Sequence, residues 1–303
     1  MLSLPSLLKE TEWGENEMKK IFAWLGILFL SFVTAAQADS AVGDVIVTLG
    51  EDLSPAQKEQ LLSEMGVPDN VTTVTVSNAE EHQYLGEYIP KAQIGSRAIS
   101  SSKITMAEQG SGLNVETNNI TWVSKGMYTN ALSTAGVKDA EIYITAPFEV
   151  SGTAALTGLI KAYETSTGEN IPEEQKQVAN EEMVTTAKLG DEIGEQEATQ
   201  LIERIKEEVA QQNPQTIQDI KVIINNVSNE LNIQLTDEQT NQLSELFNKM
   251  KELNIDWEQV NSQIDQAKEK WNEFKNSEEG KSILQSIIDF LQSIVDSIAG
   301  LFK

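Results

Sequence analysis

The chain has 303 residues, 40% of them hydrophobic, which suffices for one large domain or for two ordinary domains with apolar cores. Its 47 acidic residues against 22 Lys and Arg give a formal net charge of −25, which disfavours nucleic acid as a partner and suits either a cationic partner or simple solubility. The chain has no cysteine and one histidine, His82, so disulfides, cysteine nucleophiles and metal sites built from thiolates or paired histidines are excluded, and no cofactor is expected.

The N-terminal segment has the pattern of an export signal. Met18 opens a short cationic stretch, an apolar run of 13 residues covers 21–33, and Ala36–Ala38 places small residues at the two positions that a signal peptidase reads. A bilayer span needs roughly 20 apolar residues, so this run is short for a permanent anchor. We expect cleavage after Ala38 and a secreted, extracytoplasmic chain, with an uncleaved anchor as the alternative. Residues 1–17 are interpreted as an extension from a misplaced start codon.

Residues 40–168 mix strand signals with helix signals. Strands are expected where β-branched residues run together, and helices where a Ser or a Ser-Pro pair precedes an apolar face that ends at a glycine. In chain order, the predicted elements are strand 45–49, helix 54–66, strand 71–76, extended chain 94–106, strand 113–117, helix 124–136, strand 140–145 and a helix from Ser151 or Thr153 toward Tyr163. This alternation favours a mixed sheet with helices packed on it.

From about Pro172 the pattern becomes helical, because β-branched runs shrink and apolar residues recur at intervals of three and four. Helix starts are indicated at Asn213-Pro214, at Asp256 and at Thr236, which begins a Thr-x-x-Gln capping box. Long polar faces and short connections predict four to six helices over 173–302 in an antiparallel arrangement.

The predicted fold class is therefore α+β. A mixed α/β N-terminal domain over 40–168 is followed by an all-α helical bundle or arm over 172–303, which ends in an amphipathic helix.

Four stretches between Leu49 and Glu164 carry a family resemblance, and the last two are long and unusual in composition. They are Leu49–Ser54, Gln93–Ser101, Met127–Val137 and Ala146–Gly158. These stretches resemble the family known as domain of unknown function 1002, the YpuA-like exported proteins of Gram-positive bacteria, and the helical remainder is similar in style. The resemblance implies an exported Gram-positive protein. It supplies no catalytic residues, because the family has no established activity.

The segment 147–158 is the main candidate for a binding site. A strand ends there, and Ser151, Gly152 and Thr153 lead into a helix whose free N–H groups would favour an anion or a carboxylate. The same small residues also suit ordinary capping and close packing of a helix on a sheet. Arg97 lies in an otherwise uncharged stretch and is interpreted as the partner of a buried carboxylate.

The evidence for catalysis in the sequence is weak. Ser100 and Lys103 form a Ser-x-x-Lys pattern, in which a lysine can activate a serine nucleophile, but the pattern lies in a Ser-rich predicted strand where a chance match is easy. His82 follows two glutamates and is read as a solvated loop histidine, with a general base or a pH switch as the alternative. Acidic pairs are too abundant to single one out for hydrolysis.

The C-terminal helix carries an apolar stripe at three- and four-residue spacing. The stripe consists of Leu284, Ile287, Leu291, Ile294, Ile298 and Leu301. It could seat in the groove of a partner, lie on a membrane surface, or pack against neighbouring helices or a second copy of the chain.

Together these features favour an exported, envelope-associated binding protein without catalytic activity, whose partner is an envelope protein or a cell-surface component. Self-association and a membrane surface remain open as further contacts. The alternatives are an envelope hydrolase that uses carboxylates or Ser100, and a membrane-surface protein that docks through its C-terminal helix.

Overall fold

The computed structural model describes residues 42–68, 70–253, 255–277 and 281. The predicted signal segment over 18–38 and the apolar stripe from Leu284 to Leu301 lie outside the described residues. The fold class is α+β with a helical C-terminal part, as predicted. In the part of the chain that the structure describes, no helix has the length and apolar character that crossing a membrane would require.

The centre of the fold is a five-stranded mixed sheet in the order β2-β1-β3-β5-β4. The strands are β1 (Val45–Gly50), β2 (Thr72–Val76), β3 (Ser101–Met106), β4 (Leu113–Ile120) and β5 (Ala140–Val150). β1 pairs with β2 in parallel, β3 lies antiparallel between β1 and β5, and β4 pairs with β5 in parallel. β2 and β4 are therefore the two edges of the sheet.

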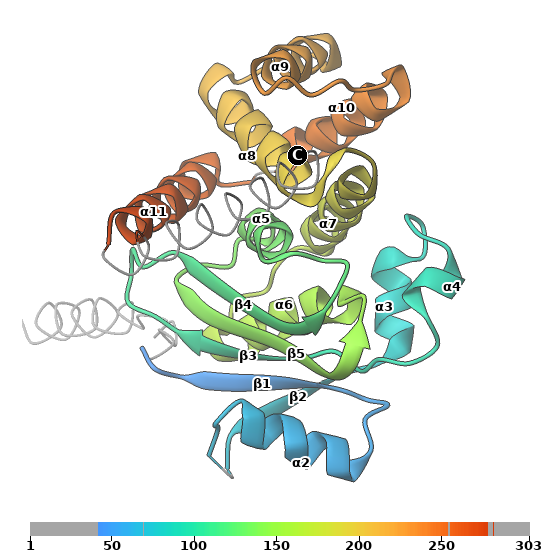
Figure 1. Ribbon diagram of the computed structural model, residues 1–303, viewed down its shortest axis with the longest axis vertical. Coiled ribbons are helices and arrows are strands. Elements are labelled where there is room, and N and C mark those ends of the chain that lie inside the picture. The colour runs from blue at the N-terminus through green and yellow to red at the C-terminus, as the bar shows by residue number, and fades with distance from the viewer. Residues whose placement is uncertain (1–41, 69, 254, 278–280, 282–303) are drawn as a thin grey trace, which may run out of the picture. The chain divides into compact units, whose positions relative to one another are not determined.

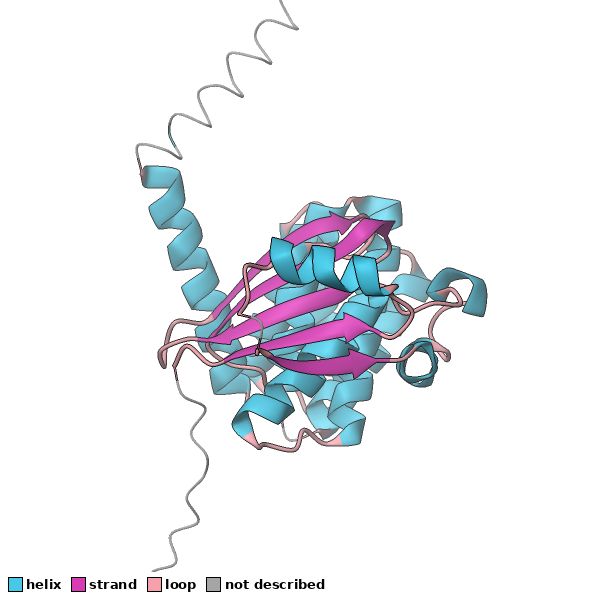
Figure 2. Ribbon diagram, turned by 90° about the horizontal axis from the view of Figure 1, so that it is seen from below, coloured by secondary structure: helices cyan, strands magenta, loops and turns pink. Residues whose placement is uncertain are grey.

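Helices cover both faces of the sheet. Figure 2 shows α2 (Pro55–Glu64) crossing one face, with several other helices behind the strands. The opposite face is covered by α5 (Lys125–Ala135) and α6 (Thr153–Thr167), whose buried side chains join those of the strands in one apolar cluster. The predicted caps at Ser54 and Ser124 are confirmed, since each side chain accepts a hydrogen bond from a backbone N–H in the first turn. Gly136 ends α5 in the left-handed conformation, also as predicted.

Two short helices replace parts of the chain that the sequence analysis placed in a loop or in extended structure. α3 (Asn78–Leu85) begins with a capping box formed by Ser77 and Glu80, and His82 lies within this helix rather than in a loop. α4 (Lys91–Ile94) overlaps the extended stretch predicted over 94–106 only at Ile94, and that stretch becomes a strand only from Ser101. The strand begins there because only residues from Ser101 onward pair with a neighbouring strand.

The start of α6 differs from the prediction. The N-cap is Gly152, in the left-handed conformation with φ of 94°, and no side chain caps the helix, so neither Ser151 nor Thr153 has the expected capping role. A Cβ atom at Gly152 would lie 2.4 Å from the Tyr128 hydroxyl oxygen and 2.5 Å from Ile120 Cγ2. Both the backbone conformation and the crowding therefore require glycine at this position.

The helical region contains five helices within the described residues. They are α7 (Glu173–Ile193), α8 (Glu195–Gln212), α9 (Ile217–Glu230), α10 (Asp237–Glu252) and α11 (Trp257–Asn276). The predicted starts at Thr236 and Asp256 are confirmed. The start expected at Asn213-Pro214 is wrong by a few residues, because Thr216 and Asp219 form the capping box of α9 instead.

The helical region packs on the α/β region through α7 and α8. α7 and α8 both contact α5, as Figure 1 shows. Buried residues of α7 such as Met183 belong to the same apolar cluster as the sheet, whereas α8, α9 and α10 form a second cluster around Leu201, Ile224 and Phe247. The junction between the two clusters positions the candidate site.

Candidate functional site

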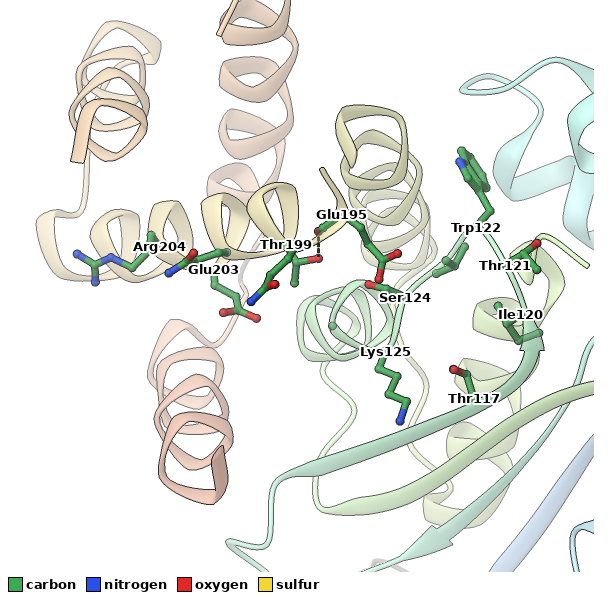
Figure 3. Close-up of a pocket in the computed structure, with 14 residues that line it drawn as sticks. Thr117, Ile120, Thr121, Trp122, Ser124, Lys125, Glu195, Thr199, Glu203 and Arg204 are labelled. Atoms are coloured by element: carbon green, nitrogen blue, oxygen red, sulfur yellow. Dashed lines mark hydrogen bonds between the residues drawn. The ribbon is translucent and has the colours of Figure 1, made fainter. Parts of the chain in front are cut away.

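An open groove of about 660 Å³ lies between the start of α5 and α8 (Figure 3). One wall comes from the end of β4 and the first residues of α5, and the other from the first half of α8. The lining residues are Thr117, Ile120, Thr121, Trp122, Val123, Ser124, Lys125, Gly126, Glu195, Gln196, Thr199, Gln200, Glu203 and Arg204. The groove thus lies where the α/β region meets the helical region, a common location for ligand sites.

The β4–α5 wall is held by backbone and side-chain hydrogen bonds. The backbone N–H of Thr121 donates to Val150 at 2.9 Å, and that of Val123 donates to Ser151 at 3.1 Å. Trp122 donates its indole N–H to Asp191 of α7 at 3.1 Å. These bonds fix the connection both to the end of β5 and to the helical region, so the groove wall has a defined position before any partner binds.

The α8 wall approaches α5 closely because of a glycine. A Cβ atom at Gly126 would lie 2.5 Å from Thr199 Cγ2, closer than real Cβ contacts allow. Thr199 is itself oriented by a 2.9 Å hydrogen bond from its hydroxyl to the backbone carbonyl of Glu195. The floor of the groove is therefore a tight helix contact that a larger residue at position 126 would open.

Charged groups of both signs lie along the groove. Lys125 extends from α5 toward β4 in Figure 3 and forms an exposed ion pair with Glu116. Arg204 points away from Lys125 in the same view and pairs with Glu207 and with Glu230. With the exposed side chains of Gln196 and Gln200, these groups give the groove a polar, mixed-charge lining.

The predicted binding residues at the start of α6 meet a carboxylate of the chain itself. Thr153 donates its hydroxyl hydrogen bond to Glu81 Oε1 of α3 at 3.0 Å. Asn78 donates to the other oxygen of Glu81 at 3.1 Å, and the Tyr128 hydroxyl donates to the carbonyl of Gly152 at 2.6 Å. The helix start expected to attract an external carboxylate is thus next to an internal one.

Glu81 is only 2% exposed, and no cation pairs with it among the described residues. The pKa of Glu81 is raised to about 7, mainly by burial and to a smaller extent by the nearby charge of Asp52, although the hydrogen bonds from Asn78 and Thr153 act to lower it. Glu81 therefore changes charge close to neutral pH. The sequence signal that could have suggested its burial was its position four residues before Leu85, on the same face of α3.

The remaining predicted site residues lie apart from one another. Lys103 donates to the backbone carbonyl of Met65 at 2.8 Å, and no described hydrogen bond joins it to Ser100. Arg97 is exposed and forms no ion pair with another described residue, so the expected pairing with a buried carboxylate is not seen. His82 Nε2 lies 3.0 Å from the carbonyl oxygen of Gly95.

Sequence reasoning missed a buried ion pair between α7 and α8. Lys206 is 1% exposed and its Nζ lies 2.6 Å from Glu182 Oε1, and the same ammonium donates to the Asn130 carbonyl and to the Thr134 hydroxyl at 2.7 Å each. Burial lowers the pKa of Lys206, an effect that Glu182 opposes. The available signal was the position of Lys206 within the apolar stripe of α8, directly after Ile205.

Comparison with known proteins gives one family and one relative. The family model described as "Protein of unknown function (DUF1002)" matches residues 49–267. The chain is 58% identical over 292 residues to "Uncharacterized protein YpuA" of Bacillus subtilis (strain 168), and the alignment covers 94% of this chain and 100% of the relative. No solved structure matches the chain. The resemblance recognised in the first half of the sequence is confirmed and extends into the helical region.

Proposed function

Because the chain belongs to the DUF1002 family, whose description names no activity, we propose a function from the chain's own geometry. The protein is an exported, envelope-associated binding protein, and its groove between α5 and α8 takes an extended, polar segment of an envelope protein. The proposal is supported by the edge strand β4 at the groove, by the lining of the groove and by the predicted export signal.

The groove opens beside an edge of the sheet, and this observation carries the proposal. β4 is the last strand in the sheet order and pairs only with β5 among the described strands. Thr117 and Ile120 of β4 line the groove. An edge strand presents unpaired N–H and C=O groups, so an extended peptide can add to it as a further strand. The backbone of the partner would supply the affinity at this edge.

The side chains of the groove would supply selectivity. Lys125 on one wall and Glu195 on the other offer charges of opposite sign, and Thr199 and Gln200 add hydroxyl and amide groups. Such a lining suits a polar segment that carries both charges better than a lipid tail or an apolar helix, which would leave these groups without partners. The export signal over 18–38 favours a partner outside the cytoplasmic membrane.

Site-specific photo-crosslinking in the native host tests this proposal. A benzophenone amino acid replaces Gln200, which is exposed in the groove, and as a matched control Gln218, which is exposed on α9 outside it. We expect an envelope protein to crosslink at position 200 and not at position 218, with the crosslinked peptide mapping to an extended segment. Equal crosslinking at the two positions, or none at position 200, would refute the groove as the binding site.

The export part is tested separately. The protein recovered outside the membrane is expected to begin at Asp39, as determined by N-terminal sequencing. A chain that keeps residues 18–38 and stays in the cytoplasm would contradict export while leaving the groove experiment interpretable with the purified protein.

A further inference from the structure

A second, smaller cavity of about 170 Å³ lies where α3, α6 and α7 meet. Figure 1 shows α3 beside α7, with α6 on the same side of the sheet. Glu80 lines the cavity from α3, Lys161 and Glu164 from α6, and Lys176 and Asn180 from α7. It is separate from the groove and shares no lining residue with it.

Two polar atoms of residues that line this cavity lack a hydrogen-bond partner in the part of the chain that the structure describes. They are Thr157 Oγ1 and Asn180 Oδ1, on residues that are 5% and 1% exposed. The amide nitrogen of Asn180 is already used, since it donates to the backbone carbonyl of Lys176 at 2.8 Å. An unpaired buried polar group costs about 1–3 kcal/mol, so two of them at one small cavity point to a bound group that supplies hydrogen bonds.

Two ammonium groups at the cavity retain hydrogen-bonding capacity. Lys161 donates to the Thr75 carbonyl at 2.8 Å and to Glu80 at 2.6 Å. Lys176 lies 2.8 Å from one oxygen of Glu164 and 3.0 Å from the other. Because a lysine ammonium has three N–H donors, each of these groups keeps one donor beyond its described contacts.

The charges at the cavity balance, since two lysines face two glutamates. A phosphate would be attracted by the lysines but repelled by Glu80 and Glu164, and a simple cation would meet the opposite conflict. A zwitterion avoids both conflicts. Its carboxylate can accept from the two ammonium groups, and its own ammonium can donate to Thr157 Oγ1 and Asn180 Oδ1.

We propose that this cavity is a binding site for a small zwitterion of the α-amino-acid class. Water occupies about 30 Å³ per molecule in the liquid, so a cavity of about 170 Å³ matches a ligand of roughly five or six heavy atoms. Glycine and alanine have this size. Because the ligand contacts α6 on one side and α7 on the other, its binding stabilises the junction of the α/β region with the helical region.

The test titrates the purified mature chain with glycine, D-alanine and L-alanine and follows the side-chain amide signal of Asn180 by NMR. Acetate and methylamine serve as probes that carry only one of the two charges, and inorganic phosphate serves as the anion probe. We expect saturable shifts with the amino acids, and binding about tenfold or more weaker for each single-charge probe, because each loses its charge-assisted contacts on one side.

Thr157→Val is the decisive variant, because it keeps the shape of the side chain and removes a hydroxyl that has no described partner. The unliganded variant should be at least as stable as the parent, because it removes an unpaired buried group, and it should bind the amino acid about tenfold more weakly. Thr165→Val, on the exposed side of α6, is the matched control and should bind as the parent does. If Thr157→Val is unstable, Asn180→Leu tests the same site independently, with amino-acid binding measured by fluorescence or calorimetry.

Several results would overturn the proposal. They are no saturable amino-acid binding, equal binding of acetate or methylamine, phosphate binding in preference to the amino acids, and unchanged affinity in Thr157→Val. The first of these would mean that the cavity holds only water.

Discussion

The α/β region and the helical region bury a carboxylate in different ways. In the α/β region, Glu81 is 2% exposed and accepts hydrogen bonds from the neutral groups of Asn78 and Thr153. In the helical region, Glu182 is fully buried and faces the ammonium of Lys206 at 2.6 Å. Both carboxylates accept hydrogen bonds from neutral groups, but only Glu182 also faces a cation among the described residues.

Because the two carboxylates are buried in different ways, they are expected to respond to different perturbations. Neutral donors do not offset the desolvation of Glu81, so its pKa rises to about 7 and pH controls its charge. At the second site each buried charge is balanced by its partner, so removing one partner leaves the other uncompensated. Two experiments therefore test the comparison. One replaces a partner of the Lys206–Glu182 pair, and the other titrates Glu81.

The largest effect is expected from Lys206→Met. This change leaves the Glu182 carboxylate buried without a cation and should lower the free energy of unfolding by about 3–5 kcal/mol. Urea unfolding followed by circular dichroism measures it. The double variant Lys206→Met with Glu182→Gln removes both charges and should recover most of the loss. A double variant as unstable as the single one would mean that the pair matters through packing and not through charge.

The next effect is the pH dependence of Glu81. The folded-state pKa of about 7 exceeds the ordinary value of 4.5, so the folded state binds the proton more tightly than the unfolded state. The resulting stability is fully present below pH 4.5 and is lost as pH rises through about 7, by a total of about 3 kcal/mol. Glu81→Gln should abolish this pH-dependent part of the free energy of unfolding.

The measurement compares urea unfolding of the parent and of Glu81→Gln across this pH window. The variant should become the more stable of the two at pH values above about 7, because it carries no buried charge there. A difference between the two proteins that does not change with pH would contradict the assignment of a raised pKa to Glu81.

A smaller effect is expected at the contact that joins the two regions. Gly126→Ala places a Cβ atom against Thr199 Cγ2 and should destabilise the protein by about 1–3 kcal/mol, although alanine is otherwise the better helix former. In a Thr199→Ser background, which lacks that methyl group, the same change should become neutral or stabilising. Thermal unfolding of the parent, the two single variants and the double variant measures both effects. If Gly126→Ala destabilises the protein equally in the Thr199→Ser background, the proposed clash is refuted.

The smallest effect is expected for Lys125→Ala. The Lys125–Glu116 pair is exposed at both ends, so its loss should change the free energy of unfolding by less than about 1 kcal/mol. Because Lys125 also lines the groove, a loss of partner binding in this variant could be assigned to the groove rather than to unfolding. A loss of stability comparable to that of Lys206→Met would remove the distinction between exposed and buried pairs on which the comparison depends.

Local signals predicted the elements whose boundaries depend on neighbouring residues. Ser54 with Pro55, Ser124 and Gly136 were identified correctly, because a cap acts within one turn of its own helix. The short helix α3 was missed even though Ser77 and Glu80 form a capping box, because its few apolar residues give no clear periodicity.

The environment of the candidate site residues could not be predicted in the same way. Glu81 and Thr153 are 72 positions apart, and so are Lys206 and Thr134, yet each pair is hydrogen-bonded. The groove combines residues near 120 with residues near 200, and no pattern in either segment indicates the other.

By itself, the sequence determined the fold class, most of the strands, several of the helix caps and the family, because these depend on residue order over short distances. Only the tertiary structure decided that Glu81 faces no cation among the described residues, that Glu182 faces Lys206, and that Thr157 and Asn180 lie at one small cavity. The physical reason is that desolvation and charge compensation depend on which groups surround an atom in space, and the chain brings those groups together only when its helices pack on the sheet.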